Sequence, residues 1–223
     1  MTEGAGAILY DGRVDLADRN NPRTRIVELI RAGSRVLEVG CATGFVGEYL
    51  AKHKGCDVLA VEIDPNAAAI ARSRGLNVVQ GSIEDPAVLE RISGSYDYVT
   101  FGDVLEHLVH PDRVIVRLAA ALSQGGHMLA SIPNVAHWSV RWRLMAGRFR
   151  YTRGGLLDDN HLRFFERRTV RALFEREGLR VRALESIYAF PLPLPLTHAA
   201  RRGIVRIFPG LFTWQFVVDA VKT

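Results

Sequence analysis

Short runs of β-branched residues alternate with helical patterns over the first two thirds of the chain. This alternation constrains the fold most, because it is typical of a mostly parallel sheet covered by helices on both faces. A helix that begins at Asn21-Pro22 and ends at Gly33 precedes the first strand. Strands are predicted at residues 35–39, 57–63, 77–80, 96–101 and 126–132, and helices at 45–54, 65–74, 86–92 and 112–122.

The alternation stops after residue 134, where an insertion rich in arginine and aromatic residues occupies 135–165. An amphipathic helix at 168–177 and strands at 180–188 and 212–221 follow. The PLPLPL run at 191–196 cannot be a central strand, because proline donates no hydrogen bond to a ladder. The sequence therefore predicts one α/β domain over residues 1–223, with a seven-stranded sheet, a lid at 135–165 and a C-terminal flap at 190–210.

Composition sets broad limits on the kind of protein. A chain of 223 residues suits one domain, and Cys41 and Cys56 form no CxxC spacing. No run of about 18 apolar residues and no secretory signal pattern occurs, so a cytoplasmic protein without a transmembrane segment is expected.

Positive charge is concentrated in one part of the sequence. Residues 137–182 hold twelve arginines and five acidic residues, a local balance of +7, whereas the whole chain carries +5. A basic surface suits anionic partners such as phosphate, nucleic acid or membrane lipid. Solvated helix faces are the alternative explanation.

A glycine-bearing loop follows the first predicted strand. Gly40, Gly44 and Gly47 have G-x-x-x-G-x-x-G spacing, which differs from the G-x-G-x-x-G of dinucleotide folds. Glycines there let the backbone turn sharply and approach a ligand. Glu38 lies two residues before Gly40, where a carboxylate would repel a pyrophosphate. It suits the ammonium and sulfonium charges of S-adenosylmethionine (SAM), which NAD lacks.

An acidic residue ends the second predicted strand. Glu62 lies 22 residues after Gly40, the distance at which a carboxylate reaches a ribose diol. Such an acceptor-only group can accept hydrogen bonds from both hydroxyls. Asp64 is the neighbouring candidate, but it precedes Pro65 and better suits a helix cap.

The ordered segments LEVGCATG, AVEIDP, QGSIED, YDYVTFGDVLEH and SIPN resemble the motif series of class I SAM-dependent methyltransferases. The resemblance covers residues 36–134 and implies a Rossmann-like fold. It implies that the backbone of residues 40–44 holds the methionine part, Glu62 the ribose, Ser82 and Ile83 the adenine, and that Asp103 lies near the methionine moiety. Cys41 is interpreted as a packing residue. The predicted cofactor-binding set is Glu38, Gly40, Cys41, Ala42, Gly44, Phe45, Glu62, Ile63, Ser82, Ile83 and Asp103.

Two histidines are the candidate catalytic bases. Methyl transfer to a hydroxyl requires an aligned acceptor and a group that removes its proton, and histidine suits this role near neutral pH. His107 follows the fourth predicted strand, and His161 lies in the insertion. Each histidine also has a structural alternative. His107 could be a hydrogen-bonded residue at the start of a helix, and His161 could be a residue that fixes the insertion to the core.

Metal binding is a further hypothesis for the same region. Asp103, Glu106 and His107 are spaced i, i+3 and i+4, so a helical turn would place them on one face, where His161 could join them. The set resembles the metal site of small-RNA 3′-end 2′-O-methyltransferases. This sequence departs from that metal site at its first acidic residue, Asp103, because the resemblance to the methyltransferases also assigns position 103 to SAM. A role in loop structure and cofactor binding is favoured, and no metal ligand is included in the predicted site.

The insertion is expected to form the acceptor side. Trp138 and Trp142 could share a helix face, and interleaved arginines and aromatic rings suit sugars, planar groups or phosphate. Packing of both tryptophans against the core is the favoured interpretation. The segments from SIPN onward also resemble a bacterial subgroup that acts on sugars, glycans or quinone-like metabolites.

O-methylation of a small polar, sugar-like or quinone-like hydroxyl is therefore the leading function predicted. The acceptor is expected to be a small molecule, anionic or sugar-containing. The alternatives are metal-assisted RNA 2′-O-methylation and a non-catalytic SAM-binding partner, and the glycine spacing opposes an NAD-dependent oxidoreductase. The segment 191–216 is interpreted by default as a buried connection to the last strand. A second flap, a homodimer surface and a membrane-surface contact are the further hypotheses for it.

Overall fold

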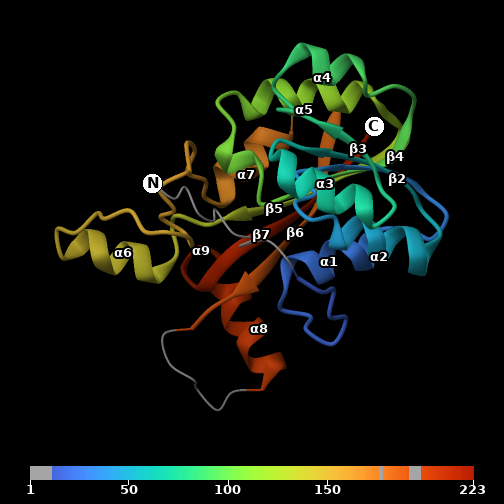
Figure 1. Cartoon of the computed structure of the whole chain (residues 1–223). Helices are drawn as coiled ribbons and strands as arrows, with labels where there is room; N and C mark the ends of the chain where they lie inside the picture. The colour runs from blue at the N-terminus through green and yellow to red at the C-terminus, as the bar shows by residue number, and fades with distance from the viewer. Residues whose placement is uncertain (1–11, 176–177, 191–196) are drawn as a thin grey trace, which may run out of the picture.

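The computed structural model describes residues 12–175, 178–190 and 197–223. Its centre is one seven-stranded sheet of order β3-β2-β1-β4-β5-β7-β6 (Figure 1). Strands β1 to β5 pair in parallel, and β7 runs antiparallel between β5 and β6. The strands are β1 (Arg35–Val39), β2 (Asp57–Glu62), β3 (Asn77–Gln80), β4 (Tyr96–Gly102), β5 (Leu122–Pro133), β6 (Leu179–Tyr188) and β7 (Thr213–Lys222).

Helices cover both faces of the sheet, and each face has its own apolar core. On β1, Val36 faces the core beneath α1 to α3, whereas Leu37 faces the core beneath α4, α5 and α7. Burial on both faces explains why the strands read as continuous apolar runs. The helices are α1 (Pro22–Leu29), α2 (Phe45–Lys54), α3 (Pro65–Ser73), α4 (Pro86–Glu90), the 3₁₀ turn η1 (Leu105–His107), α5 (Pro111–Ala120), α6 (Trp138–Met145), α7 (Arg167–Phe174), α8 (His198–Ile207) and α9 (Pro209–Phe212).

Proline-led caps set the start of several helices. Asn21 caps α1 and Asp64 caps α3, each followed by proline at the first helical position. The Asp64 carboxylate accepts hydrogen bonds from the next turn's N–H groups, which satisfies donors that a helix start leaves free. The helix-capping role predicted for Asp64 is confirmed.

Element boundaries differ from the expectation at several places. Helix α1 ends at Leu29, before Gly33, because Ile30 is already extended. Strand β5 begins at Leu122 and not at 126, since Leu122 pairs with Tyr96 across the sheet. Helices α8 and α9 occupy most of the predicted flap, whereas the PLPLPL run lies outside the described residues.

The carboxyl ends of the parallel strands meet at one edge of the sheet. The strand order reverses between β1 and β4, which is where open α/β sheets bind ligands. Gly40, Glu62 and Asp103 all follow or end strands at this edge. Among the described residues, no helix is long and apolar enough to cross a membrane.

Candidate active site

The loop between β1 and α2 requires glycine at two positions. Gly40 and Gly44 have φ values of +74° and +81°, in the left-handed region. A Cβ on Gly40 would lie 2.3 Å from Val104 Cγ2, and one on Gly44 would lie 2.7 Å from Leu76 Cδ1. Ala42 also has a positive φ, of +49°, which is strained for a residue with a side chain. The loop is therefore held in a conformation that presents backbone at the ligand edge.

Glu62 ties this loop to the end of β2. Its Oε2 accepts a hydrogen bond from the Ala42 N–H at 2.7 Å, and its Oε1 accepts one from the Asp64 N–H at 2.9 Å. The side chain is buried. Each carboxylate oxygen has a second acceptor position, so Glu62 can hold the loop and still accept from two ribose hydroxyls.

Glu38 is a buried carboxylate beneath the same loop. Its Oε2 has no hydrogen-bond partner among the described residues, and a Cβ on Gly47 would lie 2.5 Å from it. Burial raises the pKa of Glu38 to about 8, the Gly47 N–H lowers it and the nearby Glu62 charge raises it further. An uncompensated acidic group at this place favours a cationic ligand.

The residues predicted to border the adenine differ in exposure. Ile63 directly follows β2 and is 65% exposed, an open apolar surface beside Glu62. Ile83 is buried, and its side chain belongs to the core. The Ser82 hydroxyl accepts from the Glu84 N–H.

The other loop residues pack inward. Phe45 opens α2 and is buried, with the Arg23 guanidinium over its ring. Cys41 is a buried free thiol whose pKa is raised by burial, which supports packing and not nucleophilic chemistry.

Asp103 follows β4 with a φ of +58°. Its Oδ1 accepts hydrogen bonds from Ser131 Oγ at 2.6 Å and from Gln215 Nε2 at 2.8 Å. Ser131 and Gln215 are not among the residues predicted from the sequence. Their signal is a polar residue next to a run of apolar residues, in LASIPN near the end of β5 and in WQFVV near the start of β7.

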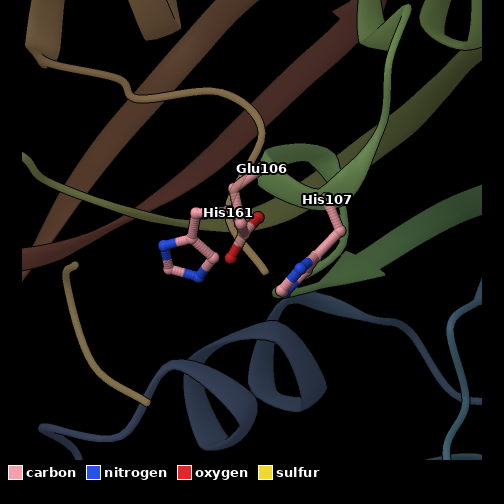
Figure 2. Close-up of side chains that lie close together, drawn as sticks. All are labelled: Glu106, His107 and His161. Atoms are coloured by element: carbon pink, nitrogen blue, oxygen red, sulfur yellow. The ribbon is translucent and has the colours of Figure 1, made fainter. Parts of the chain in front are cut away.

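The two candidate histidines lie side by side with Glu106 (Figure 2). One nitrogen or oxygen from each of Glu106, His107 and His161 lies within 4.8 Å of the others. The imidazole centroids are 4.9 Å apart at 67°. The N–H groups of Leu162 and Arg163 donate to the Glu106 carbonyl oxygen, which fixes the insertion against η1.

The three residues of this cluster differ in burial and in the direction of their pKa shifts. Glu106 is 1% exposed, and neither carboxylate oxygen has a hydrogen-bond partner among the described residues. Burial, followed by the Asp103 charge, raises its pKa well above the usual range. Burial and the neighbouring His107 lower the pKa of His161. His107 Nδ1 lies 3.1 Å from the Asn160 carbonyl oxygen.

The helical turn that would place Asp103 on one face with Glu106 and His107 does not include Asp103. The 3₁₀ turn η1 begins at Leu105, and Asp103 has a left-handed backbone that directs its carboxylate to β5 and β7. Asp103 is therefore not one of the groups whose ligand atoms lie within 4.8 Å of one another, which are Glu106, His107 and His161.

The predicted packing of both tryptophans against the core is wrong for Trp142, whereas Trp138 is half-buried and held by a hydrogen bond. Its Nε1 donates to the Ala189 carbonyl oxygen, whereas Trp142 is 67% exposed. His137, which the sequence did not single out, is buried, caps α6, and its Nε2 lies 3.0 Å from the same Ala189 oxygen. The base of α6 is thus fixed to the end of β6.

The family model described as "Methyltransferase domain" matches residues 15–184. Because this match covers more than half of the chain, the protein belongs to that methyltransferase family, and its class is the SAM-dependent class I fold. SAM is its cofactor. The residues present fit that group: a loop whose glycines leave no room for a Cβ, the Glu38 oxygen that has no partner among the described residues, and the further acceptor positions of Glu62.

Among curated proteins, the chain is similar to ubiquinone biosynthesis O-methyltransferases. One from Xanthomonas oryzae pv. oryzae is 38% identical over 109 residues, covering 46% of this chain and 44% of the relative. One from Cronobacter sakazakii is 33% identical over 108 residues, covering 46% and 43%. The match thus spans under half the length of these relatives.

Solved structures show the same fold. A SAM-dependent methyltransferase from Archaeoglobus fulgidus has a TM-score of 0.63 at 18% identity, covering 89% of this chain and 90% of that one. A Thermotoga maritima protein described as a possible histamine N-methyltransferase has a TM-score of 0.61 at 17% identity, covering 91% and 88%. At such identity the likeness concerns the fold alone.

Proposed function

We propose that the chain methylates a hydroxyl of a small acceptor, of the quinone-like phenol class, at the edge formed by the glycine loop and the His107–His161 pair. The observation that carries the proposal is the placement of His161. Its imidazole is half-buried, its pKa is lowered, and it adjoins His107 and Glu106. A sugar-like hydroxyl is the second acceptor class within this proposal.

Each residue has a defined role in this mechanism. SAM supplies a methyl group activated by its sulfonium. The Glu62 carboxylate accepts from the ribose hydroxyls, and the loop backbone at Gly40 holds the methionine part. Asp103, held by β5 and β7, orients the cationic end of that part. His161 is neutral at pH 7, because its pKa lies below the usual 6.5, and accepts the acceptor's hydroxyl proton.

A base beside the acceptor favours oxygen over nitrogen as the methylated atom. A neutral amine already carries a reactive lone pair, whereas a hydroxyl becomes a strong nucleophile only as its proton leaves. The names of the curated relatives point in the same direction.

Transfer of labelled methyl from SAM tests the proposal. The acceptors are a catechol, a sugar and an aliphatic amine, each offered with and without chelator. Label in the catechol or the sugar supports it, and label in the amine alone opposes it. His161→Ala should lower kcat by about 10²- to 10⁴-fold with unchanged SAM affinity. Binding of SAM without turnover of any acceptor would favour the non-catalytic partner.

A metal-assisted reaction is the second candidate, favoured by the unpartnered Glu106 oxygens. A carboxylate and two imidazoles are ligands for a divalent cation such as Mn²⁺ or Zn²⁺. RNA 2′-O-methylation would then use the basic insertion. Titration with Mn²⁺ alone tests the site, and saturable binding that Glu106→Gln abolishes would support it. If labelled methyl enters RNA, and does so only when chelator is absent, RNA methylation would become the leading function.

The proposed setting is the cytoplasm, which is supported by the two free cysteines Cys41 and Cys56. A homodimer stays a prediction.

A further inference from the structure

One surface of the protein projects without cover. Residues 141–155 form an unbroken exposed stretch that comprises most of α6 and the chain after it. In Figure 1, α6 and the following segment extend to one side of the sheet. We call residues 138–155 the α6 arm. Its base is held through His137 and Trp138. Its far end is held by the Thr152 N–H, which donates to the Leu157 carbonyl oxygen, and by contact of the Phe149 and Tyr151 rings with Phe164.

The arm carries large apolar side chains in the open. Met145 is 80% exposed and Trp142 is 67% exposed, and they lie three residues apart on the helix, so they share a face. Leu144, Phe149 and Tyr151 are exposed as well. Such a concentration marks an interaction site, because scattered exposed residues are ordinary but contiguous apolar patches are not.

The same arm carries only positive charge. Five arginines lie between residues 141 and 153, and no acidic residue occurs between Pro133 and Leu157. Arg143, Arg148 and Arg150, with Thr152, line a hollow of about 470 Å³. Within the described part of the chain, none of these three guanidinium groups has an ion-pair partner. Converging guanidinium groups suit phosphate.

We propose that the α6 arm docks on an anionic phospholipid surface. The Trp142 and Met145 side chains enter the boundary between headgroups and acyl chains, and the arginines around the hollow bind lipid phosphates. Tryptophan and tyrosine suit this depth because each has an apolar ring and a polar group. The arm lies on the membrane, and no part of it spans it.

The same features argue against two other partners. Nucleic acid would use the aromatic rings for stacking, but Leu144 and Met145 have no such role. A second copy in a twofold interface would bring this face against itself, and five arginines on each side would repel.

The position of the α6 arm relative to the sheet suggests what docking would achieve. The arm follows β5, whose carboxyl end borders the ligand edge of the sheet, so docking brings that edge to the lipid. An acceptor dissolved in the membrane would be presented there. The docking itself does not depend on the identity of the acceptor.

Vesicle flotation with the full chain tests the inference. One vesicle is pure phosphatidylcholine, and the other holds 30% phosphatidylglycerol. The wild type should float with the anionic vesicles only, and high salt should weaken this. Arg143→Gln/Arg148→Gln/Arg150→Gln should weaken partitioning by about 100-fold, and Trp142→Ser/Met145→Ser by about tenfold.

The matched control is Arg113→Gln/Arg117→Gln/Arg168→Gln, which removes the same charge from exposed positions on α5 and α7. It should lower partitioning by less than about fivefold. SAM affinity and melting temperature verify that each variant is folded. Equal losses in both triple variants, flotation with neutral vesicles, or binding to single-stranded RNA without vesicle binding would each overturn the inference. Loss of methyl transfer with intact flotation would oppose only the proposed function.

Discussion

The Nε2 of Gln215 donates a hydrogen bond to Asp103 Oδ1 at 2.8 Å, across 112 residues of sequence. Ser131 donates to the same oxygen, so strands β5 and β7 together fix the carboxylate that follows β4. The arrangement leaves Oδ2 free of these two bonds. It explains how a residue with a left-handed backbone keeps one orientation at the ligand edge.

Gln215→Leu should therefore weaken SAM binding while the fold persists. We expect a rise in the SAM Kd of about tenfold, since one hydrogen bond to a charged group is lost. Titration calorimetry measures this. Gln124→Leu, an exposed position near the other end of β5, is the control and should leave the Kd unchanged. An unchanged Kd in Gln215→Leu would show that Asp103 needs no support from β7.

Glu62→Ala should abolish cofactor binding and loosen the loop. The change leaves the Ala42 and Asp64 N–H groups without acceptors, so stability should fall by about 1–3 kcal/mol. SAM affinity should drop by at least about 100-fold. Asp64→Ala is the matched control: loss of the α3 cap should cost about 1 kcal/mol with SAM affinity kept. The reverse ranking of the two variants would move the ribose site to Asp64.

Glu38 should make stability depend on pH. Its pKa is raised from 4.5 to about 8 in the folded protein, so the native state binds the proton more tightly than the unfolded state does. This stabilising effect is complete below pH 4.5 and is lost as the pH rises toward 8. The free energy of unfolding should fall by a few kcal/mol over this range, about 1.4 kcal/mol for each unit of the pKa difference. Urea unfolding at pH 5.5 and 8.5 measures it. Glu38→Gln should flatten this dependence, and an unchanged slope would contradict the assignment.

The pH profile of methyl transfer should report on His161. Its pKa is lowered by burial and by His107, so the acidic limb of kcat/KM should lie below pH 6.5, with activity lost as the pH falls. His107→Asn removes one lowering charge and should move that limb toward higher pH. His53→Asn, at an exposed position on α2, should leave that limb unchanged. If neither variant moves the acidic limb of the kcat/KM profile, the general base is a residue other than His161.

Local sequence pattern predicted most of the fold. Strands β1 and β3 and helix α2 occupy the predicted residues, because burial on both faces and glycine or proline boundaries are written into contiguous residues. The position of Gly40 and Glu62 at the carboxyl edge of the sheet was predicted for the same reason, since each ends or follows a strand. Their role in binding the cofactor stays a prediction.

Tertiary structure decided what joins distant segments. Glu106, His107 and His161 meet because Leu162 and Arg163 bind the η1 carbonyl, and the Gln215 partner of Asp103 comes from the last strand. Trp142 has the same residue type as Trp138, yet only Trp138 reaches the end of β6. A sequence fixes the local hydrophobic period of each element. Which polar side chains then face one another depends on strand order and register, because these bring together residues that no local pattern relates.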